Sequence, residues 1–485
     1  MAPINSEDLV YVRSILLPEK APPVTESGVV KWVRENLFAG PVNSLLTVLG
    51  LLVVLWGVQA AYPWLRHSVW TAGSLSECRD IITARWGEGA TGACWAVIRD
   101  RWTQFIFGFY PNSLYYRPTL ALGLLFFALA PVLFSENRRV RMTLLGVVTV
   151  LLVGALIRLG TWSVYSDLGL LAVLVACLLV LWKTPAKMLW FTGIYPFLAF
   201  WLMWGGSVWL PLVAMGGFVA GWLTLRLTRP LGSVVSLVAT ILAPLIWWLF
   251  LASPANTALD SALPFAIEAV RSDKFGGFVL ALTIGISGIA MSLPLGIVLA
   301  LGRQSDMFLV KTLSVGFIEF IRGVPLIALL FTASLLLNYF LPPGSNFDII
   351  LRVVIMVTLF AAAYIAEVVR GGLAALPRGQ FEAADSLGLD YWKAQRLIIL
   401  PQALKISIPG IVSTFIGLFK DTTLVVFVGL LDPLKGITDA VRASTDWKGV
   451  YWEPYIFVAA IFFVFNFGMS RYSMYLERKL KTDHS

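Results

Sequence analysis

The chain has 485 residues, of which 58% are hydrophobic and only 13% are charged, and its mean hydropathy is +0.80. A soluble domain carries charge on about a quarter of its residues, so this composition excludes an ordinary soluble protein and indicates a protein of the lipid bilayer. The formal charge of +9 does not indicate a nucleic-acid ligand, because the Lys and Arg residues lie in short clusters between apolar runs.

Apolar runs of about 20 residues recur along the whole chain, and each is long enough to cross the bilayer as a helix. No segment shows the alternating pattern of an outer-membrane strand. We therefore expect an all-α, polytopic membrane protein with about twelve transmembrane helices. The expected spans are 41–65, 118–134, 142–157, 168–182, 189–203, 208–225, 234–251, 278–301, 312–340, 349–369, 406–431 and 455–474.

Basic residues predict the orientation of these spans, because Lys and Arg in short loops stay on the cytoplasmic side. Alternate loops carry them, in the groups Arg138, Arg139 and Arg141; Lys183 and Lys187; Arg226 and Arg229; Arg303 and Lys311; and Arg478, Lys479 and Lys481. The segment 1–40 has no apolar core of a cleaved signal peptide. We expect a bacterial inner-membrane protein whose N-terminal segment 1–40 and tail 477–485 are cytoplasmic and whose loop 66–117 is periplasmic.

The charge distribution divides the chain into two parts. Residues 41–260 form a transmembrane extension with few ionisable residues, whereas residues 276–476 carry many and are the expected transport core. Between them, residues 261–275 mix apolar and charged side chains, which predicts an amphipathic helix along the membrane interface.

The three cysteines show neither a CxxC motif nor a zinc-like spacing, so no metal site is expected. Cys78 and Cys94 lie in the predicted periplasmic loop, where oxidation is permitted, and are a candidate disulfide; two free thiols are the alternative. Cys177 is expected to be a buried apolar residue.

The segment 377–401 carries the clearest local pattern. Pro377 favours the start of a short helix, Gly388 favours its end in the left-handed conformation, and Asp390 favours the cap of a second helix. We expect a short helix, a tight turn and a second helix on the cytoplasmic face, with Glu382 and the small Ala383 and Ala384 exposed for a partner protein.

These residues, with Ile398, Leu400 and Pro401, resemble the EAA loop of bacterial ABC importer permeases. The resemblance implies that Glu382, Ala383, Ala384, Gly388 and Leu389 form a coupling helix that is seated on a separate ATPase. An amphipathic connector on the membrane is the alternative.

Further segments narrow the family. The segments 317–326, 364–372 and 419–423 resemble the polar amino-acid (histidine/glutamine-type) importers, and 32–38 resembles the larger permease of general L-amino-acid transporters. The resemblance implies a cytoplasmic ABC ATPase dimer, a second homologous permease subunit and a periplasmic amino-acid-binding protein. It also implies that ATP and Mg bind to the partner ATPase and that this chain binds no cofactor.

Ionisable residues within spans are costly, at about 2.5–3.5 kcal/mol each at the bilayer centre, so they indicate partners or a pathway. Two acid–base pairs lie three residues apart in the cytoplasmic half: Glu319 with Arg322, and Glu367 with Arg370. We expect a cross-helix network that acts as scaffold or inner gate; direct substrate contact is the alternative. Gly323 and Pro325 are expected to break the helix beside it.

Lys420, Asp421, Thr422 and Thr423 are placed near mid-bilayer by about 22 Å of helix rise from Lys405. These side chains supply the groups that an amino-acid zwitterion requires, and we regard them as substrate-path candidates. A self-paired Lys–Asp group that holds two helices is the alternative. A separate set of glycines, Gly285, Gly288 and Gly296, predicts close helix packing.

The chain contains no GxxxxGK[ST] phosphate loop and neither a GxSxG nor an HExxH motif, so catalysis by this chain is not expected. The function most consistent with these features is an ATP-driven permease that moves L-amino acids from a periplasmic binding protein across the inner membrane. An ion-coupled secondary transporter is the alternative, and it predicts paired repeats that this sequence does not show. A membrane-embedded transferase is a third possibility, which requires an acid, base or metal cluster at one face.

Overall fold

The structure is a computed structural model that describes residues 28–134, 138–159, 189–336 and 348–481, together with residues 175, 178 and 179. It divides into two compact units, one of Met1–Ala72 and Ser76–Trp95, the other of Gly73–Leu75 and Ala96–Ser485. The second unit contains both the later part of the predicted extension and the whole predicted transport core.

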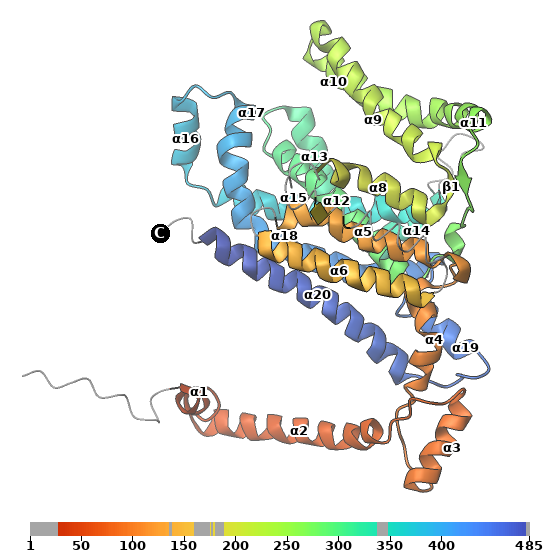
Figure 1. Cartoon of the computed structure of the whole chain (residues 1–485). Helices are drawn as coiled ribbons and strands as arrows, with labels where there is room; N and C mark the ends of the chain where they lie inside the picture. The colour runs from red at the N-terminus through yellow and green to blue at the C-terminus, as the bar shows by residue number, and fades with distance from the viewer. Residues whose placement is uncertain are drawn as a thin grey trace, which may run out of the picture. The chain divides into compact units, whose positions relative to one another are not determined.

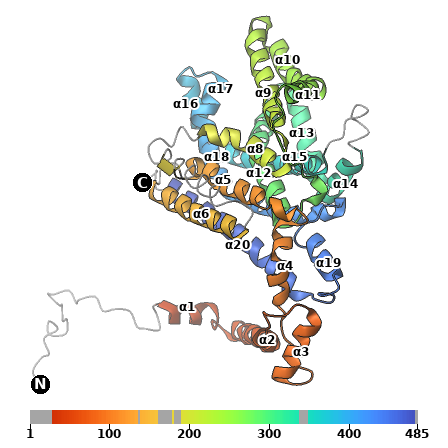
Figure 2. The ribbon, with the colours of Figure 1, turned by 45° about the vertical axis from the view of Figure 1, so that its right-hand side comes forward.

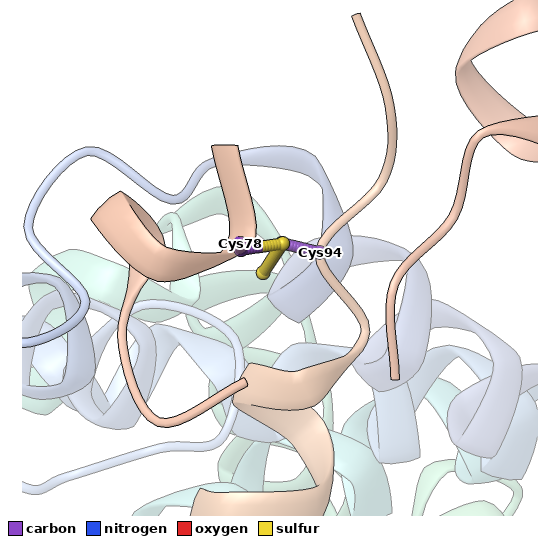
Figure 3. Close-up of a disulfide and its surroundings, with 2 residues drawn as sticks. All are labelled: Cys78 and Cys94. Atoms are coloured by element: carbon purple, nitrogen blue, oxygen red, sulfur yellow. A yellow bond between two sulfur atoms is a disulfide. The ribbon is translucent and has the colours of Figure 1, made fainter. Parts of the chain in front are cut away.

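The first unit consists of helices and a disulfide-linked loop. Its helices are α1 (Gly28–Asn36), α2 (Pro41–Arg66) and most of α3 (Leu75–Trp86). None of the residues of α2 is buried, as befits a helix surrounded by lipid or partner chains. Cys78 of α3 and Cys94 are joined by a disulfide, with their Cα atoms 6.2 Å apart (Figure 3).

The second unit begins with the remaining helices of the extension. They are α4 (Ala96–Phe107), α5 (Tyr116–Leu133), α6 (Arg138–Leu159), α8 (Leu189–Trp204), α9 (Trp209–Thr228), α10 (Ser233–Ile246) and α11 (Ala252–Ala262). The transport core follows as α12 (Gly277–Arg303), α13 (Phe308–Gly323), α14 (Leu326–Leu336), α15 (Ile349–Ala374), α16 (Arg378–Ser386), α17 (Tyr391–Ala394), α18 (Leu400–Asp421), α19 (Gly436–Ala443) and α20 (Trp452–Lys481). Helices α16 and α17 lie at one end of the core, and α4 and α19 lie at the other (Figures 1 and 2).

Within the described residues, nine helices are long and apolar enough to cross a membrane, and the bent pair α13–α14 makes a tenth. The expected span 189–203 corresponds to α8, which is apolar but only 16 residues long. The expected span 168–182 lies almost wholly outside the described residues. The expectation of an all-α polytopic protein is confirmed; the only strands of the described chain are β1 (Gly206–Ser207) and β2 (Ala266–Ile267), which pair antiparallel.

The centre of the core is the packing of α12 on α15 and α18, and three glycines allow it. A Cβ atom on Gly296 would lie 2.6 Å from Cγ2 of Ile365, and one on Gly288 would lie 3.0 Å from Cγ1 of Val357, both on α15. A Cβ on Gly285 would lie 2.8 Å from Cδ2 of Phe419 on α18. The prediction of close packing at these glycines is confirmed.

The prediction of an amphipathic helix over residues 261–275 is wrong. After α11 ends at Ala262, the chain forms β2 and then a single 3₁₀ turn at Ser272–Lys274. Tertiary hydrogen bonds replace the helical ones, because Arg117 Nη1 donates to the carbonyl of Glu268 at 2.6 Å and the Val270 amide donates to that of Trp204 at 2.8 Å. These partners lie on α5 and α8, so no local pattern in 261–275 reveals them.

The two residues that follow this segment, Gly276 and Gly277, are held between distant parts of the chain. A Cβ on Gly108 would lie 2.4 Å from Cα of Gly276, and one on Gly277 would lie 2.1 Å from the carbonyl oxygen of Phe105. The Gly277 amide donates to the carbonyl of Leu431 at 2.8 Å. The backbone of Gly276 and Gly277 is therefore packed between the end of α4 and the segment before α19, and side chains are excluded there.

The same end of the molecule carries a hydrogen-bonded link between the extension and α15. Ser272 donates to the carboxylate of Asp348 and accepts a hydrogen bond from Trp204 Nε1 at 2.7 Å. Asp348 in turn caps α15, since its Oδ1 accepts from the amides of Ile350 and Leu351 at 2.9 and 3.3 Å.

Candidate functional site

The loop 377–401 folds as the sequence predicts. Helix α16 begins after Pro377, and α17 is capped by Asp390, whose Oδ1 accepts from the Lys393 amide at 3.0 Å. Gly388 has a φ of 67°. Its amide donates to Asp385 at 2.9 Å, and the Leu389 amide donates to Ala384 at 3.2 Å, which is the hydrogen-bond pair of a Schellman motif.

Only part of α16 is open to a partner protein. Glu382, Ala383 and Gly388 are exposed, but Ala384 is 1% exposed, so its expected place on the docking surface is wrong. Ala384 lies three residues after Phe381, which packs against the core, and the two share the inner face of the helix.

The sequence reasoning missed the large exposed apolar side chains of this loop, among them Leu387 and Trp392. Leu387 is 73% exposed and Trp392 is 69% exposed, on either side of the Schellman turn. Apolar side chains in a segment rich in charge were the available signal, since exposed aromatic groups are typical of protein interfaces.

The loop 377–401 is joined to α18 by a side-chain hydrogen bond and by a continuous helical connection. Gln402 Nε2 at the start of α18 donates to Gln380 Oε1 of α16 at 2.9 Å. A π-helical segment, Gln395–Ile399, connects α17 to α18. The ammonium of Lys393 hydrogen-bonds to Asp390, and this bond and the Lys393 amide hold the pKa of that carboxyl below its usual range.

The two predicted acid–base pairs meet across helices, and a fifth charged residue, Arg303, joins them. Arg303 Nη1 at the end of α12 lies 2.8 Å from Glu319 Oε1 of α13 and 3.2 Å from Glu367 Oε2 of α15. Arg322 Nη1 lies 3.6 Å from the same oxygen of Glu367, and Arg370 Nε donates to its other oxygen at 2.8 Å. Glu367 thus binds three guanidinium groups. Sequence reasoning counted Arg303 only as a loop charge and missed this contact.

The span that carries part of this network is broken where Gly323 and Pro325 were expected to break it. Helix α13 ends at Gly323, α14 begins at Leu326, and their axes differ by 103°. Arg322, directly before the break, has its guanidinium 5.6 Å from the ring centroid of Tyr364 on α15.

Residues 420–423, the substrate-path candidates, lie where α18 changes into a 3₁₀ helix, Thr422–Val428. Lys420 is exposed and Asp421 is partly buried, and among the described residues neither forms an ion pair. The Thr422 and Thr423 hydroxyls donate to the carbonyls of Phe419 and Lys420, at 2.8 and 2.9 Å. The two charged groups, more than the hydroxyls, are therefore open to a ligand.

Comparison with known proteins gives concordant results. Residues 292–482 match the family described as binding-protein-dependent transport system inner membrane component. The chain is 60% identical over 478 residues to the glutamate/glutamine/aspartate/asparagine transport system permease protein BztC of Rhodobacter capsulatus, covering 98% of this chain and 99% of that protein. It is 35% identical over 453 residues to the inner membrane amino-acid ABC transporter permease protein YhdY of Escherichia coli K12, covering 93% of each.

Among solved structures, a crystal structure of an amino acid ABC transporter with histidines covers 41% of this chain and 91% of that chain, with 32% identity and a TM-score of 0.37. Because the first two relatives match this chain over nearly its full length and theirs, the protein belongs to the permease subunits of binding-protein-dependent ABC transport systems.

Proposed function

We propose that this permease imports polar L-amino acids, including glutamate, aspartate and their amides, across the bacterial inner membrane. It receives them from a periplasmic binding protein, and a separate cytoplasmic ATPase hydrolyses ATP to drive the movement. Its N- and C-termini are cytoplasmic. The substrate class rests on the two full-length relatives, whose names specify amino acids. Membership of an ABC permease family disfavours the ion-coupled alternative.

The observation that carries the coupling role is the geometry of α16. The short helix ends in a Schellman turn at Gly388 and exposes Glu382, Ala383 and Leu387 on a compact projection. A surface with one acid, one small residue and one apolar residue suits a groove that contains a basic group and an apolar floor. Since α17 continues through the π-helical residues into α18, and Gln402 of α18 hydrogen-bonds Gln380 of α16, a movement of α16 is transmitted to the helix that ends at Lys420 and Asp421.

The five charged residues around Glu367 form the inner gate in this proposal. They join the ends of α12 and α13 to α15, so separation of these helices breaks up to three ion pairs at once. Net attraction at the gate keeps it closed until the ATPase moves the helices. The network is partly exposed, with Glu367 at 23%, so its bonds are exchangeable with water and the gate is reversible.

Lys420 and Asp421 are the substrate contacts in this proposal. An exposed Lys at mid-bilayer costs about 2.5–3.5 kcal/mol if it faces lipid, so its exposed side is assigned to the interface with a second permease subunit, where the pathway lies. There the Lys420 ammonium pairs with the substrate carboxylate, and the Asp421 carboxylate pairs with the substrate ammonium.

The proposal is tested by purifying the complex from membranes in mild detergent and identifying the proteins that co-purify. We expect an ABC ATPase and a second permease, and ATP hydrolysis that rises when the binding protein is loaded with glutamate or glutamine. The same measurement of ATP hydrolysis, with a sugar in place of the amino acid, tests substrate specificity. Uptake that follows an ion gradient and continues without ATP hydrolysis would contradict the proposal.

A further inference from the structure

One face of α9 forms a groove in the extension, away from the transport core residues discussed above. Six residues of α9 line it at helical spacings of three and four: Leu212, Met215, Gly216, Val219, Ala220 and Leu223. Trp247 completes it, and its volume is ≈ 510 Å³. From Leu212 to Leu223 the helix rises about 16 Å, close to the roughly 15 Å depth of hydrocarbon in one bilayer leaflet.

The wall of the groove is held in place before any ligand binds. A Cβ on Gly216 would lie 2.8 Å from Cζ2 of Trp247, so only glycine lets the indole lie this close. Trp247 Nε1 donates to the carbonyl of Val213 at 2.8 Å, which satisfies the one polar atom of the ring. Trp247 also opens a π-helical segment, Trp247–Leu251, a local widening of the helix that is frequent at functional sites.

Positive charge lies at one end of the groove. Arg226 follows Leu223 by three residues, so it continues the same stripe of α9 one turn further. Its guanidinium lies 4.3 Å from the ring centroid of Trp222, and Arg229 opens the 3₁₀ turn that follows α9. The sequence contains no acidic residue between positions 209 and 259, so the charge at this end is uniformly positive.

We propose that this groove binds an anionic phospholipid, with one acyl chain along the α9 stripe and the phosphate at Arg226 and Arg229. Water does not fill such a groove, because its lining offers no polar partners. Basic groups at the membrane ends of helices attract anionic headgroups, each favouring binding about fivefold. The apolar stripe sets the depth of the chain, and the arginines select the headgroup.

The test is native mass spectrometry of the intact complex released from detergent that contains phosphatidylglycerol or phosphatidylcholine. Ala220→Trp fills the groove from its floor. Leu225→Trp places the same indole about 140° around α9 from position 220 and is the matched control. Arg226→Gln removes one of the two positive charges proposed to bind the headgroup, without changing the groove. It keeps the test decisive if Ala220→Trp lowers expression.

We expect the wild-type complex to retain one phosphatidylglycerol, which Ala220→Trp loses and Leu225→Trp keeps. Arg226→Gln is expected to reduce the preference for phosphatidylglycerol over phosphatidylcholine about fivefold. Equal retention in the two Trp variants, or an unchanged preference in Arg226→Gln, overturns the proposal. Loss of the partner permease from the Ala220→Trp complex, with no lipid retained by the wild type, means that a protein helix occupies the groove.

Discussion

The replacement of Gly388 by Asp tests the coupling surface most directly. Gly388 has a φ of 67°, a conformation that costs an L-residue about 1 kcal/mol when the residue is Asp. No atom lies within 4 Å of a Cβ built at this position, so the substitution does not clash within this chain. The membrane helices are untouched, and we expect the Gly388→Asp subunit to insert and to pair with its partner permease.

The new carboxylate adds an electrostatic cost. Position 388 lies about 9 Å of helix rise from Glu382. Two like charges at that distance repel by about 0.5 kcal/mol in water and about 2 kcal/mol at an effective dielectric constant of 20. Because the docked loop must keep this conformation whereas the free loop can relax, we expect these costs to weaken attachment of the ATPase by up to about 1.5–3 kcal/mol, which is about 10- to 150-fold.

The assay is titration of the cognate ATPase onto the permease in nanodiscs, with ATP hydrolysis and uptake measured in parallel. Gly388→Asn is the matched control, because Asn has the same size and tolerates the left-handed conformation without the charge. We expect this variant to carry only the backbone cost, which weakens attachment of the ATPase about fivefold at most. Normal uptake by Gly388→Asp, with a normal number of ATP molecules per substrate, would refute the coupling role of α16.

Three further outcomes follow from the site and the topology. Asp421→Asn should lower transport while the complex still assembles, and unchanged uptake kinetics would place the substrate contact elsewhere. Non-reducing analysis of the oxidised protein should show Cys78 joined to Cys94, whereas thiol labelling of both would contradict the bridge. An impermeant thiol reagent should reach a cysteine placed at Ser113 from outside the cell but not one at Ser386; the reverse pattern would invert the proposed orientation.

Features determined by nearby residues were accessible from the sequence. The Schellman turn at Gly388, the cap at Asp390 and the break between Gly323 and Pro325 each depend on backbone preferences within a few residues. The close packing of α12 could also be predicted, because small residues in an apolar span indicate close helix packing.

Features determined by distant residues were not. The segment after α11 is not helical, because Arg117, about 150 positions earlier, donates a hydrogen bond to the carbonyl of Glu268, which a helix would need. Arg303 joins the network around Glu367 only because α12 and α15 lie side by side, whereas its own neighbourhood indicates a loop charge. The burial of Ala384 likewise depends on how α16 sits against the core.

The packing of Gly276 and Gly277 between Phe105, Gly108 and Leu431 also constrains the order in which the protein matures. At about 5–20 residues per second, the ribosome delivers residue 431 roughly 8–31 s after residue 277. During that interval the start of α12 can rest against α4 but lacks its second neighbour. The contact of α12 with α4 can therefore form first, and the contact with Leu431 is added only when most of the chain has been made.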